Sequence, residues 1–327
     1  MPRPTDNLPG FDELTAARDV VYRSMPPTPQ YSWPLLNQAL GTDVWIKHEN
    51  HTPCGAFKLR GGLTYFDRLA RQSAAGQTIT GVVAATRGNH GQSVTLAARA
   101  QGWNATIVVP RGNSLEKNAA MQAQGARLIE HGADFQESIE LALKLADEEG
   151  LHMVPSYHRD LVCGVATYWM EFFTAQPLDV VFVPIGLGSG ICAAVAARRA
   201  LGLTCEIIGV VSSGAPAYRL SYLSGHVVSA PVTTVLADGM ACRQPHAEAF
   251  EIIRAEVADV VQVSDDEVAA AIRLLFEATH NLAEGAGAAA LAGALQLRDR
   301  CAGQRVGVVL SGANIDRPLA AEVLGQG

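Results

Sequence analysis

Lys58 is the first residue whose type and setting could do chemistry. It stands in the stretch CGAFKLRGG (54–62), between Phe57 and Leu59, with glycines at positions 55, 61 and 62. A lysine held in a dry pocket has a lowered amine pKa, and the neutral amine can form a Schiff base with an aldehyde. The stretch alone is also consistent with a surface lysine whose amine reaches solvent. The role of this amine therefore depends on what surrounds it in the fold.

Three glycine-rich segments follow apolar runs that have the character of strands. They are ATRGNHGQS (85–93), PIGLGSGI (184–191) and SGAN (311–314). Open α/β sheets place their binding sites at the carboxyl ends of strands. We therefore interpret these segments, together with Lys58, as parts of one site.

The segment GLGSG (186–190) is suited to binding an anion. Its glycines let backbone N–H groups turn toward a ligand at the start of a helix, where the helix dipole also favours negative charge. An ordinary tight turn between strand and helix is the alternative. The segment is not a dinucleotide fingerprint, which would need glycine in place of Ile191, and it lacks the GK[ST] ending of a Walker loop. A phosphate-binding turn combined with a reactive amine predicts pyridoxal 5′-phosphate as the cofactor.

The elements that must position these residues alternate between strand-like and helix-like patterns. This alternation predicts the α/β class, with parallel sheets covered by helices on both faces. We expect a small α/β domain over 80–150, inserted into a large cofactor-binding domain formed by 1–79 and 151–327. Strands are predicted at VWIKHE (44–49), GVVAAT (81–86), ATIVVP (105–110), ARLIEHG (126–132), VVFVPIG (180–186), EIIGVVS (206–212) and RVGVVLSG (305–312), and helices over 91–100, 114–124, 135–149, 191–201 and 284–295.

The composition is that of a globular protein with a large core. The chain has 327 residues, of which 48% are hydrophobic, and its net charge of −7 argues against nucleic acid or an anionic membrane as a partner. Six cysteines without CxxC spacing indicate neither a zinc site nor a disulfide framework, and they suit a reducing compartment. The N-terminus lacks an apolar signal core, and no run approaches the roughly 20 apolar residues of a membrane span. We expect a cytoplasmic protein.

The motifs around these residues resemble those of a known family. KHENHTPCGAFKLRGG (47–62) is similar to the lysine signature of the fold-type II pyridoxal-phosphate enzymes, in particular their serine/threonine dehydratase branch, which includes threonine ammonia-lyases and serine racemases. The resemblance covers about residues 28–314. It implies a tryptophan-synthase-β-like fold of two parallel-rich α/β domains with the active site between them. The other matching segments are RGNHGQS (87–93), VPIGLGSGI (183–191), TVLADGMA (234–241), AEGAGAAAL (283–291) and SGAN (311–314).

The resemblance implies a role for each matching residue. Lys58 would carry the cofactor as a Schiff base and later remove the Cα proton of the substrate, and Ser311 would face the pyridine nitrogen. For Glu284 a plain helix N-terminal charge is the alternative, and for His90 a loop-shaping role. The other cofactor contacts are expected from Phe57, Asn89, Gly186, Leu187, Gly188, Ser189, Gly190, Gly239 and Glu284, and the substrate contacts from Arg87, Gly88, Asn89 and His90.

The hydroxyl of Ser311 bears on the type of reaction that the resemblance implies. A hydroxyl cannot hold a full proton on the ring nitrogen as a carboxylate does. A long-lived carbanion is then less favoured, and loss of a β-substituent becomes the easier reaction. We expect a lyase, a dehydratase that converts a β-hydroxy amino acid of the L-threonine or L-serine type to a 2-oxo acid and ammonia. The alternatives are a dehydratase specialised for phenylserine or 3-hydroxyaspartate, a related racemase or β-replacement enzyme, and a non-catalytic homologue that binds pyridoxal phosphate. The relatives imply a homodimer or homotetramer.

The sequence also departs from the family pattern. Arg87 stands where racemising and many dehydrating relatives carry a serine that acts as a second acid or base, and an arginine stays protonated, which argues against racemase activity. Metal-activated relatives place acids at the positions of Val211 and Ala217, so we expect no divalent metal there. The sequence GLGSG replaces a plain glycine run in the phosphate loop. Because the chain ends soon after SGAN, we expect a short, catabolic-type enzyme without a regulatory domain.

Overall fold

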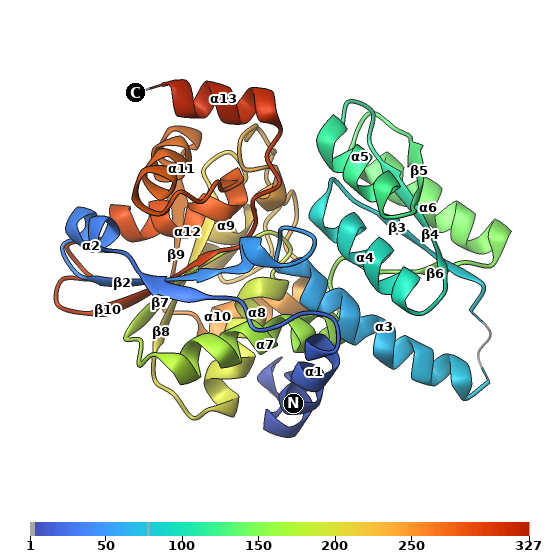
Figure 1. The fold of residues 1–327 in the computed structure, drawn as a ribbon, viewed down its shortest axis with the longest axis horizontal. Helices are drawn as coiled ribbons and strands as arrows, with labels where there is room; N and C mark the ends of the chain where they lie inside the picture. The colour runs from blue at the N-terminus through green and yellow to red at the C-terminus, as the bar shows by residue number, and fades with distance from the viewer. Residues whose placement is uncertain (1–3, 77–78, 327) are drawn as a thin grey trace.

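The computed structural model describes residues 4–76 and 79–326, and its larger sheet has six strands in the order β1-β2-β10-β7-β8-β9 (Figure 1). β1 pairs with β2 in antiparallel orientation, and the other neighbours pair in parallel. This sheet therefore brings the carboxyl ends of β2, β10, β7 and β8 to one edge. The strands are β1 (Gln30–Ser32), β2 (Asp43–His48), β7 (Val180–Pro184), β8 (Glu206–Ser212), β9 (Asp259–Val263) and β10 (Arg305–Leu310).

The smaller sheet has four parallel strands in the order β5-β4-β3-β6. All residues of β3 are buried, as expected for a central strand of a parallel sheet that is covered on both faces. We call this sheet and its helices the small lobe, and the six-stranded sheet with its helices the large lobe. The small lobe consists of β3 (Gly81–Ala85), α4 (Asn89–Ala100), β4 (Asn104–Val109), α5 (Leu115–Ala123), β5 (Arg127–Glu130), α6 (Phe135–Glu149) and β6 (His152–Met153).

Helices cover both faces of the larger sheet. Figure 1 shows α11 and α12 on one side of it and α7 and α8 on the other. The helices of the large lobe are α1 (Phe11–Tyr22), α2 (Pro34–Leu40), α3 (Lys58–Ala74), α7 (Arg159–Ala175), α8 (Ser189–Ala200), α9 (Ala217–Ser224), α10 (Ala247–Glu256), α11 (Asp265–Thr279), α12 (Gly285–Gln296) and α13 (Arg317–Gly325), with 3-10 turns η1 (Pro4–Asn7), η2 (Glu49–His51) and η3 (Asp238–Met240).

The helix α3 connects the two lobes. It packs against α7 of the large lobe and against α4 of the small lobe. At the second contact a Cβ on Gly62 would lie 2.3 Å from Ser93 Oγ, so only glycine lets the two helices come this close. The first residue of α3 therefore lies at the junction between the lobes.

The predicted α/β class is confirmed, and the seven predicted strands are present as β2, β3, β4, β5, β7, β8 and β10. The predicted helices correspond to α4, α5, α6, α8 and α12. Three strands were not predicted. β1 and β6 are short, with three and two residues, and in β9 the polar residues Asp259 and Gln262 interrupt the apolar run. The domain boundaries stay a prediction; β6 begins just beyond residue 150 and pairs with β3.

No helix in the described part of the chain is both long enough and apolar enough to cross a bilayer.

Candidate active site

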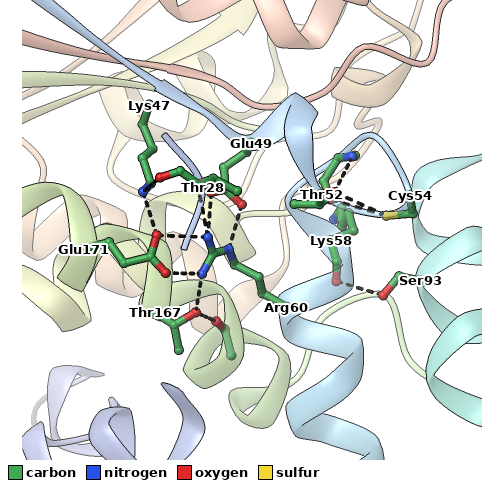
Figure 2. Close-up of polar contacts among 12 residues, drawn as sticks. Thr28, Lys47, Glu49, Thr52, Cys54, Lys58, Arg60, Ser93, Thr167 and Glu171 are labelled. Atoms are coloured by element: carbon green, nitrogen blue, oxygen red, sulfur yellow. Dashed lines mark hydrogen bonds and ion pairs between the residues drawn. The ribbon is translucent and has the colours of Figure 1, made fainter. Parts of the chain in front are cut away.

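Lys58 is the first residue of α3, and backbone contacts hold it from two directions. Phe57 N donates a hydrogen bond to Ser311 O at 3.0 Å, just after β10 ends. Ser93 Oγ on α4 donates to Lys58 O at 2.8 Å, as Figure 2 shows. The Lys58 amine lies 5.2 Å from the centroid of the Phe57 ring. The segment CGAFKLRGG is thus anchored to both lobes.

The amine of Lys58 differs from the other amines of the chain, which has four lysines. Within residues 4–76 and 79–326 it has no ion-pair partner. Burial lowers the pKa of Lys58 to about 8, and the negative charge of Glu284 opposes this shift. The other three have carboxylate partners: Lys47 Nζ lies 2.6 Å from Glu171 Oε2, Lys117 Nζ lies 2.7 Å from Asp238 Oδ2, and Lys144 Nζ lies 3.7 Å from Glu148 Oε1.

The glycine loop 186–190 lies beside Phe57 at the start of α8. Gly188 has a φ of +104°, in the left-handed region that favours glycine, and it caps the helix. A Cβ on Gly190 would lie 3.7 Å from Phe57 Cζ, and one on Gly186 would lie 2.7 Å from Gly239 O. The first N–H groups of a helix have no partner within it, so the start of α8 can donate to an anion.

The remaining residues of the loop are fixed by their surroundings. Leu187 O accepts a hydrogen bond from Tyr218 Oη at 2.8 Å, and Ser189 is buried. Gly239 lies behind the loop, where its added Cβ would lie 3.0 Å from that of Ala286 on α12. The loop, the segment around 239 and the start of α12 therefore form one continuous wall.

Asn89 connects the small lobe to the large lobe through side-chain hydrogen bonds. Its Nδ2 donates to Glu284 Oε1 at 2.6 Å, and its Oδ1 accepts from Asn314 Nδ2 at 2.8 Å. Asn314 Nδ2 also donates to Cys54 O at 2.8 Å. Residues from four of the matching motifs therefore meet in one chain of contacts.

Glu284 is buried at the start of α12 with few partners for its carboxylate. Its Oε2 has no hydrogen-bond partner in the described part of the chain, and Lys117 Nζ lies 3.7 Å from it. Burial raises the pKa of Glu284 to about 7; Lys117 opposes this effect and Asp238 adds to it. Glu284 therefore contacts Asn89 and Lys117 as well as standing at the N-terminus of a helix.

Ser311 lies at the carboxyl end of β10, and its side chain is buried. Its Oγ donates a hydrogen bond to Ala286 O at 3.3 Å. Glu284 N donates to Gly312 O at 3.1 Å, which keeps the start of α12 next to Ser311. The hydroxyl can donate to, or accept from, a polar group placed beside it.

The segment 87–90 has one exposed and one buried polar side chain. Arg87 is exposed, and within residues 4–76 and 79–326 it makes no hydrogen bond or ion pair. His90 is buried, and burial together with the charge of Lys58 lowers its pKa to about 3. The backbone of Gly88 is covered by Lys117, whose Cδ would lie 2.5 Å from an added Cβ. The structure thus places Asn89 and His90 near Lys58, and the contact of Arg87 with the substrate stays a prediction.

Three polar residues of this region were not predicted as site residues. Asn314 belongs to the motif SGAN, so that motif could have identified it as a site residue. Lys117 and Asp238 are far apart in the sequence, and only the tertiary fold brings them together. A cavity of about 420 Å³ opens between the lobes beside them. Its polar lining comes from Asn113, Ser114, Lys117, Asp238, Glu284, Asn314 and Asp316.

The positions at which metal-activated relatives carry acids are apolar here. Val211 and Ala217 are buried in the large lobe. The described residues contain no group of three or more histidine, cysteine, aspartate or glutamate side chains placed to hold a metal ion. The absence of a metal from this enzyme stays a prediction.

The chain belongs to the pyridoxal-phosphate dependent enzymes, whose family model matches residues 21–312. It is 30% identical to an L-threo-3-hydroxyaspartate ammonia-lyase from Saccharomyces cerevisiae over 94% of both chains. It is 36% identical to an L-threonine ammonia-lyase from Geobacter sulfurreducens over 89% of this chain and 72% of that one. The structure is similar to that of maize serine racemase, with a TM-score of 0.89, 25% identity and coverage of 97% of both chains. The predicted family, fold and cofactor are confirmed.

The described residues fit pyridoxal phosphate on chemical grounds. Lys58 offers an unpaired amine to the aldehyde, and the glycine loop offers helix N–H groups to the phosphate. Ser311 and Asn89 offer hydrogen-bonding groups to the ring. Glu284 Oε2 and His90 Nε2 are buried polar atoms without a hydrogen-bond partner among the described residues, so both are available to a bound group.

Proposed function

We propose that this chain is a pyridoxal-phosphate-dependent ammonia-lyase that dehydrates and deaminates a β-hydroxy amino acid of the L-threonine or L-serine type. The observation that carries the proposal is the Lys58 amine, which is half-buried and unpaired and whose neighbour Phe57 is hydrogen-bonded to Ser311. The similarity to two ammonia-lyases, one acting on L-threo-3-hydroxyaspartate and one on L-threonine, supports the same reaction.

Lys58 has two tasks in this proposal. Its amine would hold the aldehyde of the cofactor, and the same amine, when free, would accept the Cα proton of the substrate. Because the pKa of Lys58 is about 8, part of this amine is neutral near neutral pH and able to accept a proton. The bound cofactor supplies the electron withdrawal that makes the Cα proton acidic.

Ser311 and the segment 87–90 select among the reactions open to the cofactor. The Ser311 hydroxyl would share a hydrogen bond with the ring nitrogen without providing a full proton, which would favour loss of the β-hydroxyl. The backbone N–H groups at the start of α4 bind the substrate carboxylate. The Arg87 guanidinium stays protonated and cannot act as a second base, so racemisation is disfavoured.

A panel of substrates tests the proposal directly. The protein loaded with pyridoxal phosphate is incubated with the L and D forms of serine, threonine, threo-3-hydroxyaspartate and phenylserine, and 2-oxo acid, ammonia and enantiomeric purity are measured. We expect equal amounts of 2-oxo acid and ammonia from L-threonine or L-serine and little change of enantiomeric purity. Efficient interconversion of enantiomers without ammonia would replace the lyase by an isomerase, and no product at all would leave a non-catalytic cofactor-binding protein.

We infer a homodimer or homotetramer from the resemblance to the family, and light scattering of the loaded protein tests it. The cytoplasmic location and the small inserted domain over 80–150 likewise stay predictions.

A further inference from the structure

A cluster of charged side chains lies buried near Lys58 and has no part in the chemistry proposed above. We call Lys47, Glu49, Arg60 and Glu171 the buried charge cluster. The side chains of Lys47, Glu49 and Arg60 are 0% exposed, and that of Glu171 is 7% exposed. The positive and negative charges balance, which offsets part of the cost of removing them from water.

Arg60 lies at the centre of the cluster and is bound in bidentate fashion by both carboxylates. It donates from Nε and Nη2 to the oxygens of Glu49 at 2.8 and 3.0 Å, and from Nη1 and Nη2 to those of Glu171 at 2.6 and 3.0 Å. Nη1 also donates to Thr167 Oγ1 at 3.1 Å. A planar group bound along several edges is fixed in rotation as well as in position.

The partners of Arg60 come from elements outside α3. Glu49 begins η2 directly after β2, and Glu171 lies on α7. Lys47 on β2 closes the cluster by donating to Glu171 Oε2 at 2.6 Å. The backbone of α7 also lies close to this turn of α3, since a Cβ on Gly164 would lie 2.2 Å from Arg60 O. Arg60 therefore ties the first turn of α3 to β2 and α7.

Lys58 and Arg60 point to different sides of this turn. Residues two apart on an α-helix point about 200° apart around its axis. Figure 2 shows Arg60 directed toward Glu49 and Glu171, while Ser93 contacts the Lys58 carbonyl from the other side. Rotation of α3 about its axis would break the contacts of Arg60 and displace the Lys58 amine together.

We propose that Arg60 is a positioning residue for Lys58. Through Glu49 and Glu171 it sets the rotation of the first turn of α3, and so the place of the Lys58 amine relative to the glycine loop 186–190. The proposal rests on the proposed role of Lys58 in holding pyridoxal phosphate. Loss of the bidentate contacts leaves the phosphate-binding loop intact and moves the amine away from the aldehyde for part of the time.

The substitution Arg60→Lys tests the proposal, because it keeps the positive charge and loses the planar bidentate group. Full-length protein is loaded with pyridoxal phosphate, and total cofactor is measured after alkaline release. The cofactor is then removed and added back, and the return of the visible absorbance of amine-linked cofactor is followed. We expect Arg60→Lys to bind the cofactor but to recover this absorbance about tenfold more slowly than the wild type.

Arg198→Lys is the matched control, because it loses an arginine–glutamate contact far from Lys58. Arg198 lies near the end of α8, is 14% exposed in its side chain and donates to Glu256 Oε2 at 2.6 Å. We expect this variant to unfold at a lower temperature and to recover the absorbance at the wild-type rate. Equal slowing in both variants, or the wild-type rate in Arg60→Lys, overturns the positioning role.

A milder variant keeps the proposal testable if Arg60→Lys does not fold. Thr167→Val preserves the shape of the side chain and removes the hydrogen bond from Arg60 together with the one that Thr167 donates to Gly164 O, and we expect a slowing of about threefold. The wild-type rate in this variant overturns the positioning role. A wild-type protein that attaches no cofactor to Lys58 overturns the proposed function, and this proposal with it.

Discussion

The buried charge cluster and the surroundings of Lys58 lie on two sides of the same helical turn, yet their charges are partnered differently. Arg60 donates to Glu49 and to Glu171, and Lys47 donates to Glu171 as well. The Lys58 amine has no ion-pair partner, and Glu284 Oε2 has no hydrogen-bond partner, within the described ranges. Fully paired charges hold an element in place, whereas a buried polar atom without a hydrogen bond, such as Glu284 Oε2, is costly until a ligand satisfies it.

Glu171 and Glu284 show that burial alone does not set the pKa of a carboxylate. Burial by itself raises the pKa of Glu171, but Arg60 and Lys47 bring it below its usual value. Burial also raises the pKa of Glu284, and Lys117 alone is too distant to reverse the effect, so that pKa lies at about 7. The number and closeness of cationic partners therefore distinguish a structural carboxylate from one suited to a binding site.

Lys58→Ala should have the largest effect on activity. It removes both the amine that holds the cofactor and the base for the Cα proton, so we expect turnover to fall about a thousandfold or more. The release of 2-oxo acid measures this loss. Lys144→Ala is the control, because its side chain is 64% exposed, and it should retain wild-type turnover. Comparable turnover in the two variants would remove Lys58 from the mechanism.

Glu171→Ala should have the largest effect on stability. It leaves Lys47 without its carboxylate and Arg60 with only one, and we expect the free energy of unfolding to fall by about 3–5 kcal/mol. Urea denaturation measures the difference. The exposed pair of Glu251 with Arg254 supplies the control Glu251→Ala, for which we expect a loss below about 1 kcal/mol. Similar losses at both sites would contradict a structural role for the buried charge cluster.

Glu284→Gln should change how stability depends on pH. The folded-state pKa of Glu284, about 7, is above the usual value of 4.5, so its contribution to stability is fully present below 4.5 and is lost as the pH rises through about 7. Glutamine does not ionise, so the variant should gain stability relative to the wild type across this range. Urea denaturation of cofactor-free protein at a series of pH values measures the trend, and a constant or opposite difference would disprove it.

Arg87→Ala should have the smallest effect. Because the side chain is exposed and makes no described contact, we expect the free energy of unfolding to change by no more than about 0.5 kcal/mol. If Arg87 orients a polar substrate, the KM for threo-3-hydroxyaspartate should rise by up to about fivefold and that for L-threonine should change less. Equal changes for both substrates would show that Arg87 does not contact the substrate side chain.

Much of the fold and part of the site followed from local patterns. The apolar runs of β3 and β7 and the glycines directly after them predicted strands and turns, because a central parallel strand is buried on both faces. The rule that sites form at the carboxyl ends of strands then grouped Lys58 with the glycine loop and Ser311. These features depend on residues that are close in the sequence or on a general property of open sheets.

The contacts that hold Lys58 could not be predicted in the same way. Arg60 is 111 positions from Glu171, and Lys117 is 121 positions from Asp238, so the first pair depends on how α3 packs against α7 and the second on how α5 meets η3. In the sequence, Lys47 and Lys117 resemble ordinary surface lysines. Only the packing shows which lysine lacks a carboxylate partner.

The most direct test of the central claim is to identify the lysine that carries the cofactor. Protein loaded with pyridoxal phosphate is reduced with borohydride and digested, and the labelled peptide is identified by mass spectrometry among the four lysines of the chain. We predict one label, on Lys58, and its absence from Lys58→Ala. A label on Lys47, Lys117 or Lys144 in its place, or no label on any of them, would contradict the account.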